Sequence, residues 1–352
     1  MTAYSQGKQA PVDAFKLSSN ENPFPPLPAV LDVIAEANAT VNRYPDGAAL
    51  PLRTALAGRH GVETSQVHLG AGSISVLTQL VSAAAGPGDE VIFSWRSFEA
   101  YPGLVTVTGA TPIAVPNRPD HGHDIDAMVA SVTPRTRVMI VCTPNNPTGV
   151  TVSRAEFESL MAGVPDDLLV LLDEAYFEFI SDPDRLDGMR LLARYPNLVV
   201  LRTFSKAWGL AGLRIGYAVG AAPILSAAAS AAIALSLAAA AQAAALVSLD
   251  YERQILDQVA VIVDRRERLR AGLRSLGWNV PHSEGNFLWL PTGAWSGQVA
   301  EALAERGIVA RALLPEGVRV SVGEEESVAK LLKAAADIVP DLPIEARGAR
   351  LD

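Results

Sequence analysis

The stretch NLVVLRTFSKAWGLAGLRIGYAVG, residues 197–220, decides the fold. It begins with an apolar run, Leu198–Arg202, and then passes into a polar cluster that ends at Lys206. A short apolar run that stops at polar residues is typical of a buried strand in a parallel sheet. Three similar runs precede it in the chain: Glu90–Phe93, Arg137–Cys142 and Leu168–Leu172. We therefore predict a buried, mainly parallel sheet.

Helical segments are expected between these strands, for example Ser153–Gly163 after the turn at residues 146–149. Alternating strands and helices predict an α/β domain with helices layered on the sheet. After Asp250 the pattern changes to one long, charged amphipathic helix, Arg253–Leu276. Short strands follow at residues 285–290 and 318–322, which indicates a second, smaller α+β domain.

The Pro-rich segment at residues 22–28 predicts an extended arm, because proline removes a backbone donor and restricts the residue before it. We divide the chain into an N-terminal arm that joins the small domain (1–40), a large domain (41–250) and a small C-terminal domain (251–352).

Composition limits the classes of partner. The formal net charge is −9, so the chain lacks the basic field that attracts nucleic acid or an anionic membrane. Cys142 is the only cysteine, and the five histidines show no zinc-site spacing. The first residues lack the layout of a signal peptide. We expect a small-molecule partner, no metal and a cytoplasmic setting.

One uncharged segment, Ile224–Leu249, is long enough to cross a bilayer. Alanine dominates it, and alanine has much less insertion drive than leucine or phenylalanine. We predict instead a helix packed tightly inside the fold or against a partner subunit, since small residues allow backbones to approach closely.

Lys206 is the first candidate for chemistry. The chain has five lysines and 24 arginines, and Lys206 stands alone between Lys16 and Lys330. A desolvated lysine can become the neutral amine that attacks an aldehyde, whereas arginine stays protonated. The position after a strand is where open α/β sheets keep their ligands. A surface lysine in a turn is the alternative.

Two elements around this lysine suit a phosphate group. Thr203, Ser205 and Arg214 offer two hydroxyls and a guanidinium near one amine. The segment Gly70–Ser73 follows an apolar run and opens a helical stretch, so its backbone N–H groups can face an anion. It lacks the G-x-G-x-x-G spacing of a dinucleotide site, which argues against a nicotinamide cofactor.

Polar residues end other strands. Asp173 follows Leu168–Leu172, and its carboxylate can pair with a protonated ring nitrogen or cap a helix. Tyr176 and Asn146 can reach the same ring, although Asn146 also fits an ordinary Asn-Pro turn. In the strand at 318–322, Arg319 lies opposite its apolar neighbours and can bind a carboxylate, or it can lie exposed on an edge strand.

These residues occur in a sequence order that resembles fold-type I aminotransferases, which use pyridoxal 5'-phosphate. The similarity is greatest to the histidinol-phosphate aminotransferase branch, and within it to aromatic-amino-acid aminotransferases. It implies a three-layer α/β/α large domain and a smaller α+β domain. The matching motifs are Asn20–Pro23, Arg43–Asp46, Asn145–Gly149, Asp173–Tyr176, Ser205-Lys206, Gly212–Gly216, Asn286-Phe287 and Arg319–Gly323.

The resemblance implies a role for each residue. Lys206 holds the cofactor covalently and moves the proton, Asp173 holds the pyridine nitrogen, and Asn146 and Tyr176 contact the ring oxygen. Phe98 stacks on the ring. The phosphate contacts come from Gly72, Ser73, Ile74, Thr203, Ser205 and Arg214. Arg319 binds the substrate carboxylate, and Asn22 and Phe24 line the substrate pocket.

The family also implies a homodimer with shared active sites, in which Tyr44 reaches the phosphate of the neighbouring subunit's cofactor. Two stretches depart from the family pattern. Ile74 and Ser75 replace the usual acidic residues after the phosphate turn, and residues 234–239 are plainer and more apolar than in relatives. Both departures bear on side-chain preference rather than on the catalytic residues.

The resulting expectation is transamination of an aromatic amino acid with a 2-oxo acid such as 2-oxoglutarate, by a ping-pong mechanism. The nearest alternative is histidinol-phosphate transamination, in which Arg319 receives the substrate phosphate. A decarboxylase on the same scaffold is a further alternative. A cofactor-binding regulator is disfavoured, because the resemblance begins near residue 15 and leaves no room for a DNA-binding extension.

Overall fold

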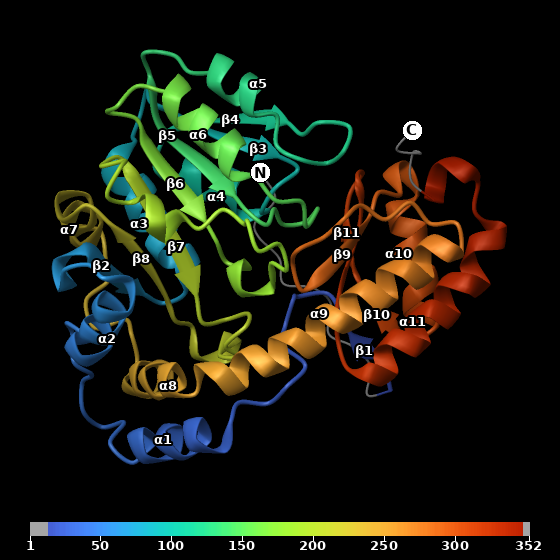
Figure 1. The fold of residues 1–352 in the computed structure, drawn as a ribbon, viewed down its shortest axis with the longest axis horizontal. Helices are drawn as coiled ribbons and strands as arrows, with labels where there is room; N and C mark the ends of the chain where they lie inside the picture. Colours follow the sequence, from blue (N-terminus) through green and yellow to red (C-terminus); the bar gives the residue numbers. More distant parts are fainter. Residues whose placement is uncertain (1–12, 348–352) are drawn as a thin grey trace.

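A seven-stranded sheet forms the centre of the larger part of the molecule (Figure 1). The structure, a computed structural model, describes residues 13–347. Across the sheet the strands follow the order β2 (Val67–Gly70), β8 (Gly216–Gly220), β7 (Leu198–Thr203), β6 (Leu169–Asp173), β5 (Thr136–Cys142), β3 (Glu90–Trp95) and β4 (Thr111–Pro116).

The sheet is mainly parallel, as the sequence predicted. Strands β4, β3, β5, β6 and β7 all run in the same direction, and β8 is antiparallel to both of its neighbours. The four predicted runs are β3, β5, β6 and β7, and their bounds differ from the prediction by one or two residues.

Both faces of the sheet are buried, which explains the continuous apolar runs. On β5, Val138 and Ile140 pack in the cluster formed with α3 (Ser73–Ala84), α4 (Ala100–Val107) and α7 (Ala222–Ser230). Their neighbours Met139 and Val141 pack on the opposite face with α5 (Ile125–Ala130) and α6 (Arg154–Gly163). Because successive strand residues alternate in direction, this gives three α/β/α layers. The predicted large-domain architecture is confirmed.

The C-terminal part is α+β, as expected. Helix α9 (Glu252–Ser275) leads into it, within one residue of the predicted bounds (Figure 1). Its antiparallel sheet has the order β11 (Arg311–Leu313), β12 (Gly317–Ser321), β9 (Phe287–Leu290). Helices α10 (Ser296–Glu305) and α11 (Glu325–Ile338) pack beside it. The N-terminal strand β1 (Phe15–Lys16) pairs in parallel with β10 (Ile308–Val309). The proposed divisions at residues 40 and 250 stay predictions.

The expectation of one helix over the alanine-rich segment is wrong. The structure has two helices there, α7 and α8 (Ala239–Asp250), and residues 231–238 between them include Leu235 in the left-handed region, with φ 60°. Helix α7 packs on α3, whereas α8 packs on α1 (Pro28–Asn38) and α2 (Leu50–His60), so packing overrides the helical propensity of alanine. Within residues 13–347, the helices fall short of the apolar length that a bilayer crossing needs.

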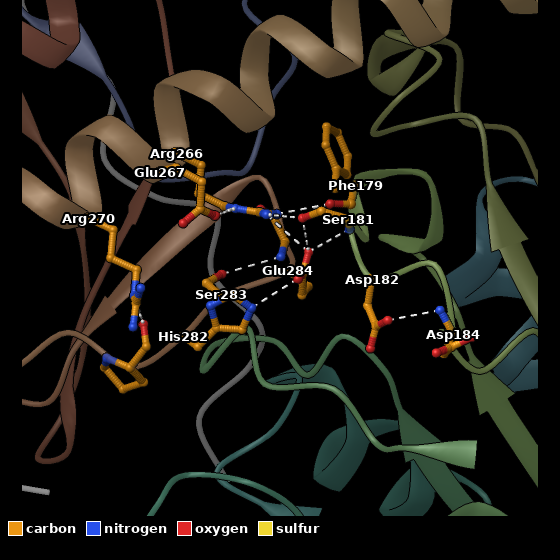
Figure 2. Close-up of polar contacts among 12 residues, drawn as sticks. Phe179, Ser181, Asp182, Asp184, Arg266, Glu267, Arg270, His282, Ser283 and Glu284 are labelled. Carbon is orange, nitrogen blue, oxygen red and sulfur yellow. Dashed lines mark hydrogen bonds and ion pairs between the residues drawn. The ribbon is translucent and has the colours of Figure 1, made fainter.

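A buried polar cluster joins α9 to two loops (Figure 2). Arg266 is fully buried, and its guanidinium donates to the Phe179 and Gly285 carbonyls, to Ser181 Oγ at 2.9 Å and to Glu284 Oε2 at 3.0 Å. The Glu284 backbone N–H donates to the Gly149 carbonyl at 2.8 Å. The cluster therefore links α9 to the turn at residues 145–149.

Arg266→Met is expected to lower the free energy of unfolding by about 3–5 kcal/mol, because it leaves the Glu284 carboxylate buried without its cation. Burial raises the pKa of that carboxyl, but His282, Ser181 and Arg266 together outweigh burial and lower it to about 2. Urea denaturation followed by circular dichroism measures the change. Arg253→Met, at an exposed arginine of the same helix, is the matched control and should leave the midpoint unchanged. Equal midpoints for the two variants contradict the prediction.

Candidate active site

The predicted site residues meet at one edge of the seven-stranded sheet. Asp173 ends β6, Lys206 follows β7, Asn146 follows β5, and Ser73 follows β2 at the start of α3. The carboxyl ends of these strands share one edge, where open α/β sheets bind ligands. A cavity of about 660 Å³ lies there. Its lining includes Ser18, Ser19, Asn20, Glu21, Ser73, Ile74, Phe98, Glu99, Cys142, Asn146, Asp173, Ala175, Tyr176, Thr203, Ser205, Lys206, Ala211, Gly212, Arg214, Arg311 and Arg319.

Lys206 has an amine suited to attack on a carbonyl group. Its Nζ atom donates to the carbonyl oxygens of Ser19 and Asn20, each at 3.2 Å. Burial, followed by the positive charge of Arg319, lowers the pKa of this amine to about 7. A large share of the amine is therefore uncharged near pH 7. The uncharged amine is the form that reacts with a carbonyl group.

Asp173 is a buried carboxylate that is placed to bind a cation. Its Oδ2 atom accepts a 2.8 Å hydrogen bond from Tyr101, while its Oδ1 atom lacks a hydrogen-bond partner within residues 13–347. Burial raises the pKa of this carboxyl above its ordinary value, although Tyr101 opposes that shift. A ring N–H⁺ at Oδ1 would satisfy both the charge and the missing hydrogen bond.

A phosphate cradle lies at the N-terminus of α3. The Arg214 guanidinium donates to Ser205 Oγ at 3.4 Å and to the Ala211 carbonyl at 3.0 Å, and Arg214 has a left-handed φ of 54°. Strain of this kind at a non-glycine residue marks a constrained site. Gly72 has φ 85°, and a Cβ there would overlap the Arg214 guanidinium. Glycine at this position therefore leaves room for the guanidinium beside the N–H groups at the start of α3, so that both can donate to one anion.

Arg319 and the ring-contact residues form one connected group. Arg319 Nη1 donates to Asn146 Oδ1 at 2.6 Å, and Nη2 donates to the Ser18 carbonyl at 2.7 Å. Asn146 thus keeps its Nδ2 group as the donor for a ring oxygen. The Tyr176 hydroxyl accepts from Asn20 Nδ2 at 3.0 Å, and burial raises its pKa above the ordinary value. Phe98 lines the same cavity, with its ring edge-on to Tyr101.

Three residues from the prediction lie elsewhere. Asn22 donates to the carbonyls of Lys206 and Ala207, at 3.3 and 3.0 Å, so it fixes the arm against the lysine segment. Phe24 contacts the side chain of Arg265 through its ring face. Tyr44 is 86% exposed. The structure does not bring these three side chains to the cavity of their own chain, and their binding roles stay predictions.

Several residues at the cavity have no site role among the sequence-based predictions. Ser18 to Glu21 border the cavity because the N-terminal arm crosses it, and Asn20 has a left-handed φ of 53°. Tyr101, which contacts Asp173 but does not line the cavity, lies three residues after Phe98, so the spacing of the two aromatic rings was an available signal. Glu99 and Arg311 come together through a long-range pairing that has no local signal.

Residues 13–347 hold no group of three or more His, Cys, Asp or Glu side chains that could hold a metal ion. The residues around the cavity fit an organic cofactor. A lysine amine with a lowered pKa, a carboxylate with an unpaired oxygen and a phosphate cradle fit the aldehyde, ring nitrogen and phosphate of pyridoxal 5'-phosphate. The fold and the site thus define the class of lysine enzymes that use a phosphorylated aldehyde.

Comparison with known proteins narrows this class. Residues 12–334 match the family Aminotransferase class I and II. An aromatic amino acid aminotransferase from Streptomyces avermitilis is 49% identical over 328 residues, which cover 92% of this chain and 91% of that protein. One from Thermobifida fusca is 50% identical over 308 residues, 88% of this chain and 86% of that protein.

The solved structures agree in fold. Histidinol-phosphate aminotransferase from Sinorhizobium meliloti, in complex with pyridoxal-5'-phosphate, superposes with a TM-score of 0.87 at 25% identity, covering 94% of this chain and 92% of that one. The chain belongs to the class I and II aminotransferase family, and it is an aminotransferase. The family and the bound neighbour imply pyridoxal phosphate as its cofactor.

Proposed function

We propose that the protein transaminates aromatic amino acids with a 2-oxo acid, of which 2-oxoglutarate is the first candidate. The observation that carries the proposal is the placement of Lys206, Asp173 and Arg319 around one cavity. The aromatic preference is supported by several relatives, 45–50% identical over most of the chain, that are named aromatic amino acid aminotransferases.

Pyridoxal phosphate, when bound, supplies an aldehyde that condenses with amines and a ring that withdraws electrons from the substrate Cα. Lys206 is the residue we assign to covalent attachment and to proton transfer. Its Nζ atom, whose pKa is lowered to about 7, would accept the proton from the substrate Cα and return it to the cofactor carbon that carries the amino nitrogen. Asp173 would keep a proton on the ring nitrogen, because a cation at its Oδ1 atom, which lacks a partner within residues 13–347, would stabilise the buried carboxylate.

The remaining residues hold the reactants in place. Ser73, Ile74, Thr203, Ser205 and Arg214 are assigned to the phosphate, beside Gly72. Phe98 is assigned to the ring face, and Asn146 and Tyr176 to the ring oxygen. Arg319 is assigned to the substrate carboxylate. Fixing that carboxylate orients the Cα–H bond toward Lys206, and orientation supplies a large part of such rate accelerations.

A homodimer with shared active sites is part of the proposal. Tyr44 is exposed in the single chain, and so are the apolar side chains of Val41, Leu50 and Ile233. Gln242 Nε2 donates to the Asp46 carbonyl at 2.9 Å, so the segment around Asp46 lies against the start of α8. Exposed apolar side chains of this kind suit a subunit contact. A cytoplasmic location completes the proposal and agrees with the single cysteine.

The choice of donor is tested by comparing phenylalanine with histidinol phosphate, each with 2-oxoglutarate. The proposal predicts a higher kcat/KM for phenylalanine. A higher value for histidinol phosphate contradicts the aromatic assignment while leaving the aminotransferase assignment intact. Release of carbon dioxide in place of amino transfer would identify a decarboxylase.

Arg319→Gln is expected to lower kcat/KM for phenylalanine by at least about 30-fold, the effect of truncating a buried, hydrogen-bonded charge partner. Steady-state kinetics measures the loss, and cofactor absorbance checks that the ring remains bound. Arg306→Gln replaces a partly exposed arginine whose guanidinium bonds the Ala302 carbonyl, and it is the matched control. An Arg319→Gln enzyme with wild-type kcat/KM would remove the carboxylate role.

A further inference from the structure

Two arginines face the cavity from one hairpin. Arg311 on β11 and Arg319 on β12 are direct cross-strand partners, so their side chains leave the same face of the small sheet. Both border the cavity. Arg319 is buried against Asn146, beside the predicted ring-contact residues. Arg311 therefore lies one strand away from the residue assigned to the substrate carboxylate, where the far end of a substrate side chain can reach.

A carboxylate already holds Arg311. Glu99, directly before α4, accepts hydrogen bonds from Arg311 Nη2 at 3.0 Å (Oε1) and 3.1 Å (Oε2), and from Nε at 3.2 Å. A chelated guanidinium of this type is a strong, geometrically fixed pair. The Arg311 and Glu99 side chains are only 14% and 25% exposed, so the charges are partly shielded from water.

The other charges along the cavity indicate how the Glu99–Arg311 pair affects substrate binding. Of the described residues, four cationic side chains border the cavity, and three of them have assigned partners in catalysis: Lys206 with the cofactor aldehyde, Arg214 with its phosphate and Arg319 with the substrate carboxylate. Arg311 is the fourth. Its charge is offset by Glu99, so an anionic side chain that approaches Arg311 also meets the Glu99 carboxylate. A neutral ring meets no such repulsion.

We propose that Glu99 is a specificity-determining residue, which holds Arg311 and so weakens, without abolishing, the binding of substrates whose side chains end in a negative charge, 2-oxoglutarate included. The inference rests on the proposed transamination of aromatic substrates. It assigns a binding penalty on dicarboxylic 2-oxo acids to one carboxylate. Specificity through a repulsive element is a general device of binding sites.

The test uses the holoenzyme with tyrosine as donor and two acceptors, phenylpyruvate and 2-oxoglutarate, which share the reacting end and differ in the charge of the other end. Glu99→Gln removes the charge and keeps the shape. The ratio of kcat/KM, 2-oxoglutarate over phenylpyruvate, is expected to rise at least about tenfold, since the substitution removes a repulsion between like charges.

Arg311→Gln provides the opposite change. It leaves Glu99 without this cation at the cavity, so the same ratio is expected to fall below the wild-type value. Glu316→Gln is the matched control. Glu316 lies on the same hairpin as Arg311 and pairs with Arg96, but it does not line the cavity. It should leave the ratio unchanged. Thermal melting followed by circular dichroism identifies a variant that fails to fold, and the other variant then carries the test.

The outcomes separate cleanly. Opposite shifts in Glu99→Gln and Arg311→Gln support the inference. An unchanged ratio in a folded Glu99→Gln enzyme, or a shift of the same size in Glu316→Gln, overturns it and leaves the proposed function standing. Failure of the wild-type enzyme to use tyrosine with either acceptor overturns the proposed function, and the inference with it.

Discussion

Lys206→Ala is expected to reduce transamination of phenylalanine by at least about 10²- to 10⁴-fold, the contribution of one positioned acid–base group. The physical reason is the state of the amine. Its pKa is lowered to about 7 by burial and by Arg319, so the wild-type side chain can be both a nucleophile and a proton carrier at neutral pH. Alanine removes both functions, and the covalent link to the cofactor disappears with them.

Lys206→Arg separates charge from reactivity. Arginine keeps the positive charge but stays protonated, so it cannot attack an aldehyde, and we expect the same loss as with alanine. Lys16→Ala is the matched control, because Lys16 pairs with Glu21 at 2.9 Å near the cavity. Turnover is measured with phenylalanine and 2-oxoglutarate. A Lys206→Ala enzyme with wild-type turnover contradicts the assignment.

Asp173→Asn is expected to lower kcat by about 10²-fold or more, because the amide cannot stabilise a protonated ring nitrogen as the buried carboxylate does. The fold should tolerate the change. Burial raises the pKa of Asp173 in the folded state, so its ionised form is disfavoured there and destabilises the protein above the ordinary carboxyl pKa. Removing that charge should leave the cofactor-free protein at least as stable at neutral pH.

This combination of effects distinguishes catalysis from folding. Stability is measured by urea denaturation of the cofactor-free protein, and turnover is measured with saturating cofactor. Asp182→Asn, at an exposed aspartate beyond the same strand, is the control and should change neither quantity. A large loss of stability in Asp173→Asn would assign Asp173 a structural role, and unchanged turnover would remove the ring-nitrogen role.

The sequence was most informative where the structure depends on residues that are close together in the chain. Strand ends were predictable because apolar runs stop at Asp173 and after Leu198–Arg202, and parallel strands bring such ends to one edge. The cradle at Ser73 was predictable from a glycine turn that opens a helix. For these residues a local pattern was enough to place them at the cavity.

Other features of the fold and of the site depend on contacts between residues far apart in the chain. The pairing of Glu99 with Arg311 joins residues more than two hundred positions apart, and no local pattern predicts it. The alanine-rich segment reads as one helix, yet α7 and α8 are separate because each packs on a different partner. Asn22 matched a substrate-binding position, but its amide bonds the backbone around Lys206. In each case distant contacts outweigh the local preference of the chain.

Borohydride reduction of the protein loaded with pyridoxal phosphate, followed by trypsin digestion and mass spectrometry, tests the central claim most directly. The account predicts one modified peptide, from Thr203 to Arg214, because trypsin does not cleave after a modified Lys206. Lys8, Lys16, Lys330 and Lys333 serve as internal controls and should stay unlabelled. Label on one of those four with an unmodified Lys206 would contradict the account.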